Sequence, residues 1–321
     1  MDQGGAVAGP ARTAMTSIPQ IPLSPAALSF DAEYAAARRR ARLSWTVGLV
    51  IFAILFALTS WASDFFKYTQ MTMPDGSRQW GWVIPAGIPR LGEFIVKMIP
   101  ELRWATLGAD IAEWFWRIDA WLWLLLETIL IAFMATVLAV FGALILAFPS
   151  ARNLAPRPWL MWITRRYLEI CRTVPDLVWA LIFVYCFSVG PLAGVLAVAL
   201  HATGALGKLY SEAIENIDMR PLDGVKAAGG SWFDQCRYGA LPQVMPNVLS
   251  YTLLRFEINV RSSSIIGYVG AGGLGQEFRI AMSFQEYTDL SALFVITLVT
   301  VITIDFLSEK LRHRVIGMDR T

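Results

Sequence analysis

Long apolar runs are the feature that most constrains this 321-residue sequence. The first extends from Leu43 to Trp61 and directly follows an arginine cluster at residues 38–42. A helix needs about 20 apolar residues to cross the hydrocarbon core of a bilayer, and this run meets that length. Composition agrees, because 16% of the residues are charged, whereas soluble domains carry about 25%. We therefore expect an all-α membrane protein.

Five further apolar stretches raise the expected number of transmembrane helices to about six. They lie at about residues 121–148, 168–189, 192–210, 244–260 and 290–307. The N-terminal segment, the loops after the second and fourth spans and the C-terminal segment are rich in arginine and lysine. The positive-inside rule places such segments in the cytoplasm, so both termini are expected there.

These spans divide the chain into five predicted parts. Residues 1–42 form a mostly disordered, basic cytoplasmic tail, and residues 43–61 form the first transmembrane helix. Residues 62–119 combine prolines, aromatic residues and charges of both signs, which favours an extracytoplasmic loop with interfacial helices. The other spans make a core domain at 120–310 that includes a polar loop at 219–242, and residues 311–321 are a cytoplasmic tail.

Composition also argues against several functions. The formal net charge of +2 disfavours a nucleic-acid partner, because such domains concentrate basic residues on one face. The three cysteines and two histidines have no metal-ligand spacing, so neither a metal site nor a catalytic residue is expected. A membrane-embedded enzyme would need a cluster of such residues, and the two scattered histidines do not supply one.

The polar loop at 219–242 predicts two short helices that project from the membrane. Pro221 suits the first turn of a helix, which can run from Leu222 to Ala228. Gly229 and Gly230 can end it, because glycine accepts the left-handed conformation of a helix C-cap. Leu222 and Val225 would share one face, and a compact apolar projection of this kind is typical of a site that docks a soluble partner.

A second helix is predicted to follow directly. Ser231 and Asp234 have the spacing of a capping box, in which each side chain bonds the backbone of the other residue. This helix is expected to stop near Gly239 and Pro242, since proline inside a helix removes a hydrogen bond.

The same loop resembles the cytoplasmic motif of ABC importer permeases, Glu-Ala-Ala-x3-Gly-x9-Ile-x-Leu-Pro. Asp223 falls at the Glu position, Gly229 at the Gly position and Leu241–Pro242 at the closing pair, without gaps. The departures are Asp for Glu, Gly224 and Val225 for the two alanines, and Gly239 for Ile. The resemblance implies a coupling helix that inserts into a groove of a separate ATPase subunit. It assigns this coupling to Leu222, Asp223, Val225, Ala228, Gly229, Ser231, Leu241 and Pro242.

A second segment, INVRSSSIIGYVGAGGLGQEF from Ile258 to Phe278, resembles the signature after the fifth span in phosphonate-type permeases. The resemblance extends from about Thr128 to the C-terminus and implies a type I ABC importer permease with a methionine-permease-like core, in a bacterial inner membrane. Phosphonates or related phosphorus oxyanions are the implied substrates. Phosphate, phosphite and methionine stay open as alternatives, because methionine importer permeases also carry a glycine-rich segment here.

The glycine-rich segment can be interpreted in two ways from its residues. Each glycine costs a helix about 1 kcal/mol relative to alanine, so a break between the fifth and sixth spans is expected. Such a break is tolerated at membrane depth where it lines a watery cavity or is buried in protein. It forms either a polar gate with Arg261 as the cation, or a tight turn in which Arg261 reaches the interface or pairs with Glu257. The predicted pathway residues are Arg261, Ser262, Ser263, Ser264, Gly270, Gly272, Gly273 and Gly275.

Nucleotide binding is not expected on this chain, because the glycine-rich string lacks the Gly-Lys-Ser/Thr ending of a P-loop. The resemblance places ATP and Mg on two partner ABC ATPase subunits and implies no cofactor on this chain. It also implies a second permease, identical or paralogous, an extracytoplasmic substrate-binding protein and surrounding membrane lipid. An ion-coupled secondary transporter is the less favoured alternative, since such proteins usually contain internal repeats and the sequence has no convincing one.

Overall fold

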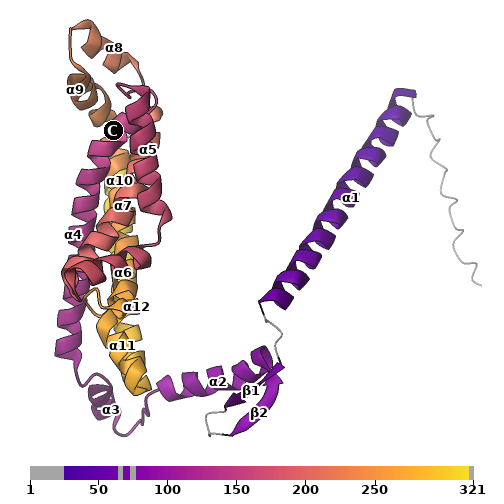
Figure 1. Cartoon of the computed structure of the whole chain (residues 1–321), viewed down its shortest axis with the longest axis vertical. Coiled ribbons are helices and arrows are strands. Elements are labelled where there is room, and N and C mark those ends of the chain that lie inside the picture. Colours follow the sequence, from indigo (N-terminus) through magenta and orange to yellow (C-terminus); the bar gives the residue numbers. More distant parts are fainter. Residues whose placement is uncertain (1–24, 64–67, 73–76, 318–321) are drawn as a thin grey trace, which may run out of the picture. The chain divides into compact units, whose positions relative to one another are not determined.

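The computed structural model describes residues 25–63, 68–72 and 77–317, and the chain divides into two compact units, Met1–Arg90 and Leu91–Thr321 (Figure 1). The predicted disordered tail lies outside the described residues as far as residue 24. Beyond it the prediction is wrong, because α1 runs from Pro25 to Ala62 and residues 25–42 are helical. This stretch is rich in alanine and arginine, which are strong helix formers, and it continues without a break into the predicted first span.

The predicted extracytoplasmic loop at 62–119 contains an antiparallel hairpin that the sequence analysis missed. Strand β1, Tyr68–Thr72, pairs with β2, Arg78–Trp82, so that Tyr68 lies opposite Trp82. The helices expected in this region are present as α2, Val83–Met98, and α3, Leu107–Trp114. The side of the membrane on which the region lies stays a prediction.

Four helices of the described residues are long and apolar enough to cross a membrane. They are residues 37–62 of α1, all of α4 (Ile118–Ser150) and α7 (Pro191–Glu215), and residues 287–314 of α12 (Tyr287–Gly317). The bent pair α5, Pro158–Thr173, and α6, Asp176–Phe187, would make a fifth span. α10, Leu241–Ile266, occupies the place of the predicted fifth span; its 26 residues are long enough to cross a membrane, but its sequence is more polar.

The predicted third span, residues 168–189, is not one straight helix, because α5 and α6 meet at 90°. Pro175 causes the break: it lacks an N–H and it forces the preceding Val174 into an extended conformation, with ψ 123°. Side chains satisfy the carbonyl groups freed at the bend. The indole N–H of Trp179 donates to the Cys171 carbonyl over 3.3 Å, and Nδ1 of His201 lies 3.0 Å from the Val174 carbonyl.

Small residues bring the helices of the second unit close together. On α4, Ala139, Ala143 and Ala147 recur every four residues and are fully buried in one cluster with residues of α7. A side-chain carbon added at Gly204 of α7 would lie 2.6 Å from the Leu168 carbonyl oxygen on α5. Such small-residue contacts are typical of helix packing inside membranes. Lipid removes the hydrophobic driving force between helices, so close backbone packing stabilises their association instead.

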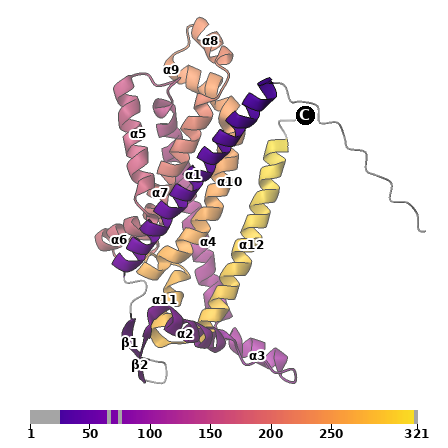
Figure 2. The same ribbon diagram turned by 90° about the vertical axis from the view of Figure 1, so that its right-hand side faces the viewer.

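The remaining elements lie at the two ends of this helical bundle. At one end α8, Arg220–Ala227, and α9, Trp232–Asp234, project beyond α4, α7 and α10, and α3 lies at the opposite end (Figures 1 and 2). A π-helical turn, η1 at Gln235–Ala240, joins α9 to α10. A short 3-10 turn, η2 at Gly267–Val269, leads from α10 through the glycine-rich segment to α11, Gly275–Phe284.

Candidate functional site

The helical hairpin α8–α9 forms the end of the bundle predicted to couple to an ATPase. Its first helix ends as predicted, in a Schellman motif. The N–H of Gly230 donates to the Val225 carbonyl over 2.9 Å, and the N–H of Gly229 donates to the Lys226 carbonyl over 3.0 Å. Gly229 has a φ of +82°, the left-handed conformation that glycine accepts without a Cβ clash.

The capping box predicted at the start of α9 is confirmed. The Asp234 N–H donates to the Ser231 hydroxyl over 3.3 Å, while the Ser231 N–H donates to the Asp234 carboxylate over 2.9 Å. The side-chain hydrogen bond from Ser231, followed by the backbone one, lowers the pKa of Asp234. The carboxylate form that makes the cap is therefore the form present at neutral pH.

The predicted end of the second helix near Gly239 and Pro242 is wrong. The chain passes from α9 through the π turn directly into α10 without leaving a helical conformation. Pro242 lies in the first turn of α10. The wider π turn just before it relieves the clash that a proline ring makes with the carbonyl one α-helical turn earlier. Gly239 has a packing role, because a side-chain carbon there would lie 2.9 Å from Cγ of Leu222.

Leu222, predicted to face a partner, instead anchors the hairpin to the permease core. It is 2% exposed and belongs to the same buried cluster as α4 and α7. Trp232 also ties the hairpin down, since its indole N–H donates to the Leu154 carbonyl over 2.6 Å. The exposed surface of the hairpin includes Asp223, Ala228, Gly229, Ser231, Pro242 and Phe233, whereas Val225 and Leu241 are half-buried. The coupling role of these residues stays a prediction.

Cys236 lies inside the hairpin on the π turn and is buried. Burial raises the pKa of its thiol to about 11, so the nucleophilic thiolate is scarce at neutral pH. Its environment therefore suits a structural cysteine.

The glycine-rich segment breaks the helix as predicted. Gly270, Gly272 and Gly273 all have positive φ, between +72° and +95°. Residues 270–275 are buried. A side-chain carbon at Gly272 would lie 2.9 Å from Cα of Pro191, and one at Gly273 would lie 2.4 Å from Oγ1 of Thr128.

Two side chains of α4 hold the backbone of this break. The Leu274 N–H donates to the Thr128 hydroxyl over 2.8 Å, and the Gly273 N–H donates to the Glu127 carboxylate over 3.3 Å. The start of α7 adds a third bond, from the Gly190 N–H to the Gly270 carbonyl over 2.9 Å. In this conformation the segment has the geometry of a tight, buried turn. Thr128 had no predicted role, and its position 146 residues before Leu274 in the chain gave no local signal.

Arg261 does not pair with Glu257, as one alternative expected, but with Asp305 of α12. Its guanidinium donates to both carboxylate oxygens, each over 2.7 Å, and both side chains are partly exposed. Asp305 therefore neutralises the cation that was predicted to meet an anionic substrate.

The predicted serines differ in their surroundings. Ser264 donates to the Val260 carbonyl over 3.2 Å, and Ser262 is half-buried. Ser263 is buried, and its hydroxyl has no hydrogen-bond partner among the described residues. Their place on a substrate pathway stays a prediction, as does that of Gly275, which packs against Ser264 and Gly267.

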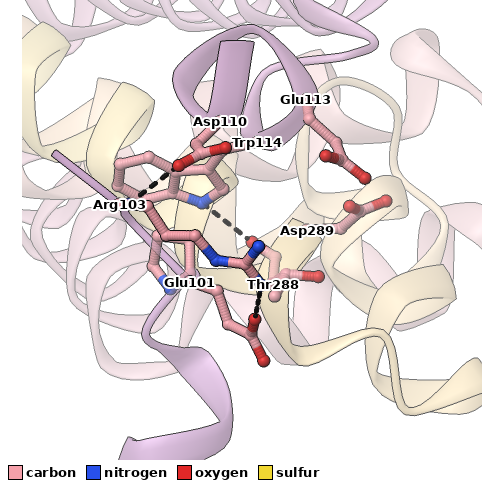
Figure 3. Close-up of a pocket in the computed structure, with 8 residues that line it drawn as sticks. Glu101, Arg103, Asp110, Glu113, Trp114, Thr288 and Asp289 are labelled. Atoms are coloured by element: carbon pink, nitrogen blue, oxygen red, sulfur yellow. Dashed lines mark hydrogen bonds and ion pairs between the residues drawn. The ribbon is translucent and has the colours of Figure 1, made fainter. Parts of the chain in front are cut away.

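A polar pocket of about 410 Å³ lies at the end opposite the hairpin, where α3 meets the start of α12 (Figure 3). The Arg103 guanidinium bonds Glu101 over 3.1 Å, and the backbone N–H of Arg103 donates to Asp110 over 2.8 Å. The Trp114 indole N–H donates to the Thr288 carbonyl over 3.2 Å. Sequence reasoning missed this pocket, because its two sides lie more than 170 residues apart in the chain. In residues 25–63, 68–72 and 77–317 no cluster of His, Cys, Asp or Glu could hold a metal ion.

Several apolar helices, a projecting helical hairpin and a buried break between α10 and α12 describe a multi-pass membrane protein. Residues 139–315, more than half of the chain, match the family described as binding-protein-dependent transport system inner membrane component. The chain belongs to this family and is a permease of an ABC importer.

Proteins similar to this chain in sequence are named as transport permeases. The putative phosphite transport system permease protein HtxC of Stutzerimonas stutzeri is 36% identical over 235 residues, which cover 73% of this chain and 79% of HtxC. The phosphate-import permease protein PhnE of Mycolicibacterium smegmatis is 35% identical, over 62% of this chain and 37% of its own length. The putative cryptic phosphonate transport system permease protein PhnE2 of Escherichia coli is 46% identical, over 38% of this chain and all of PhnE2.

Solved structures share the fold. An inward-facing structure of the MetNI methionine ABC transporter matches with a TM-score of 0.53 and 17% identity, over 61% of this chain and 95% of that chain. A bacterial ABC transporter involved in import of alginate matches with a TM-score of 0.52 and 11% identity, over 86% of this chain and 99% of that chain. The expected fold class, an all-α type I importer permease, is thereby confirmed.

Proposed function

We propose that this permease carries phosphorus oxyanions, with phosphonate, phosphite and phosphate as the candidate substrates. The observation that carries the proposal is the similarity to HtxC, which is 36% identical over 79% of its length. Relatives named for phosphite, phosphate and phosphonate transport match this chain at 35–46% identity. The methionine transporter supports the fold alone, because it is 17% identical.

The energy for transport is proposed to come from two ABC ATPase subunits that bind ATP and Mg. The exposed part of the hairpin supports docking of such a subunit, since Phe233 is 63% exposed beside Asp223, Ala228 and Ser231. An exposed aromatic residue on a short, well-capped projection has the character of an anchor for a partner groove. In this proposal the hairpin faces the cytoplasm, where the positive-inside rule also places both termini and the basic loops.

A second permease, identical or paralogous, completes the pathway in this proposal, and an extracytoplasmic binding protein delivers the substrate. The similarity of this chain to several separate permeases of one phosphite or phosphonate class supports either arrangement.

Uptake of labelled phosphite, methylphosphonate, phosphate and methionine tests the proposal in cells that express the permease with its ATPase and binding protein. We expect uptake of at least one phosphorus oxyanion, abolished when the catalytic residues of the ATPase are inactivated. Uptake of methionine alone would refute the substrate class, and uptake that persists without ATP hydrolysis would refute the ATP-driven mechanism.

A further inference from the structure

A basic pocket between α5 and α7 has no role in the coupling hairpin or in the glycine turn. It has a volume of about 250 Å³ and is lined mainly by charged side chains. Drug-sized ligands occupy pockets of roughly 300–1,000 Å³, so this pocket suits a smaller ligand.

Charge in the pocket is unbalanced. Five cationic and three carboxylate side chains line it, which leaves an excess of two positive charges. Glu215 pairs with Arg165, and Glu212 lies 3.0 Å from Lys208. Glu169 is shared, because it bonds Arg166 over 2.5 Å and lies 3.9 Å from Arg172. Arg172 is therefore weakly compensated, and across the part of the chain that the structure describes no carboxylate pairs with the Arg152 guanidinium.

The floor of the pocket is held in place independently of any ligand. Arg165 donates through Nε to the Ser150 carbonyl over 2.8 Å as well as pairing with Glu215. Glu215 in turn accepts the backbone N–H of Arg152 over 2.9 Å. These bonds tie the end of α4 to α5 and α7, so Arg152 and Arg172 are presented at one cavity by a fixed frame.

The pocket lies at the hairpin end of the bundle. Asn153 donates to the Ile214 carbonyl over 2.8 Å, and the next residue, Leu154, accepts the hydrogen bond of Trp232. If the hairpin docks an ATPase, the pocket opens on the cytoplasmic side. The side of the membrane on which the pocket opens therefore rests on the proposed function, whereas the charges that line the pocket do not.

We propose that this pocket is a binding site for a phosphate-type group, a tetrahedral phosphorus oxyanion held chiefly by Arg152 and Arg172. Guanidinium groups match such oxyanions because their planar forks donate two parallel hydrogen bonds. The excess of two positive charges would balance the two negative charges of a phosphate dianion. The cavity of about 250 Å³ has room for one small oxyanion. The group can come from a free oxyanion, such as released substrate, or from the headgroup of an anionic lipid.

Phosphate binding to the purified importer complex tests the site. Isothermal titration with inorganic phosphate is performed in neutral detergent, without nucleotide and at low salt. The wild type is compared with the double variant Arg152→Gln/Arg172→Gln and with the control Arg157→Gln. Arg157 lies on the same loop and outside the pocket, so the control removes a cation without touching the site.

The lipid source is tested on the same proteins. Their thermal unfolding midpoints are measured in vesicles of phosphatidylcholine, with and without phosphatidylglycerol. Because neither readout requires transport or ATP, failure of the proposed substrate class leaves both measurements interpretable.

Each outcome decides the proposal. Phosphate binding that weakens about tenfold in the double variant and is unchanged in the control supports a free oxyanion ligand. Stabilisation by phosphatidylglycerol that is lost only in the double variant supports a lipid headgroup. Equal behaviour of wild type and double variant in both measurements overturns the proposal. If the double variant fails to assemble, Glu169→Gln tests the site in the opposite direction. We expect this variant to bind phosphate more tightly, because Arg166 and Arg172 lose a competing carboxylate. Unchanged phosphate binding in this variant overturns the proposal.

Discussion

Gly224 inside α8 and Gly229 just beyond its end should respond to the same substitution with stability changes of opposite sign. A side-chain carbon at Gly224 or at Gly229 would meet no atom within 4 Å, so neither substitution creates a steric clash with a neighbour. Gly224 lies inside the helix, where alanine is favoured by up to about 1 kcal/mol. Gly229 has a φ of +82°, where a side chain costs about 1–2 kcal/mol. The predicted difference between Gly224→Ala and Gly229→Ala is therefore about 1–3 kcal/mol in the stability of the hairpin.

Hydrogen–deuterium exchange of the α8 amides measures this difference directly. Local opening that becomes 2 kcal/mol easier raises the exchange rate about thirtyfold. We expect Gly229→Ala to exchange faster than wild type and Gly224→Ala to exchange at the same rate or more slowly. Gly229→Val, which is β-branched, should be the most severe.

The functional consequence is measured in reconstituted membranes, by co-purification of the ATPase and by ATP hydrolysis stimulated with loaded binding protein. We expect Gly229→Val to remain inserted but to weaken one or both. Identical exchange in Gly224→Ala and Gly229→Ala would refute the backbone argument. Wild-type exchange and wild-type stimulated hydrolysis in Gly229→Val would show that the hairpin does not couple as proposed.

Substitution of Asp223 or Gly273 and labelling of Cys236 give three further tests. Asp223→Ala should weaken ATPase co-purification only mildly, because an exposed charge contact contributes about 0–1 kcal/mol; complete loss would give Asp223 a larger role. Gly273→Ala should lower the thermal unfolding midpoint of the permease. A side chain at a φ of +72° costs about 1–3 kcal/mol by itself, and the new Cβ would lie 2.4 Å from Oγ1 of Thr128. An unchanged midpoint would contradict the tight turn. Cys236, with a pKa raised to about 11, should stay protonated and react slowly with maleimide at pH 7 until the protein is unfolded in detergent. Fast labelling of the native protein would contradict its burial, whereas raising the pH toward 11 should accelerate labelling if the fold persists.

Local chemistry explains why parts of the site could be predicted from the sequence. The Gly229 cap and the Ser231–Asp234 capping box involve residues within five positions of one another. The glycine-rich break likewise follows from backbone preferences that each glycine carries by itself.

Packing between distant segments explains where the predictions failed. Leu222 was placed on an exposed face by helix periodicity, but Gly239 opens a space that buries it. One alternative paired Arg261 with Glu257 on its own helix, but Arg261 pairs with Asp305, 44 residues away on α12. No pattern along a single helix contains such a partner. The helical conformation of residues 25–42 was missed for another reason: residues 1–42 were treated as one tail, although alanine and arginine favour a helix in its second half.

The continuity of α10 connects the two predicted functional regions. If the second helix of the hairpin had ended at Pro242, as predicted, a loop would have separated the hairpin from the membrane helix. Instead the π turn carries the helix from Trp232 to Ile266, and Leu222 packs against that turn through Gly239. The far end of α10 leads through η2 into the glycine turn, whose backbone is held by Thr128 of α4.

One continuous helical segment, which includes the π turn and Pro246, therefore connects the hairpin to the glycine turn. The turn cannot move with α10 and also keep its bonds to α4, because the Leu274–Thr128 hydrogen bond and the Gly273 contact fix it there. A movement of the hairpin that shifts α10 as a rigid rod would therefore either carry α4 along or break these contacts. If the hairpin couples to an ATPase as proposed, Thr128 is the residue at which its movement would reach the predicted translocation path.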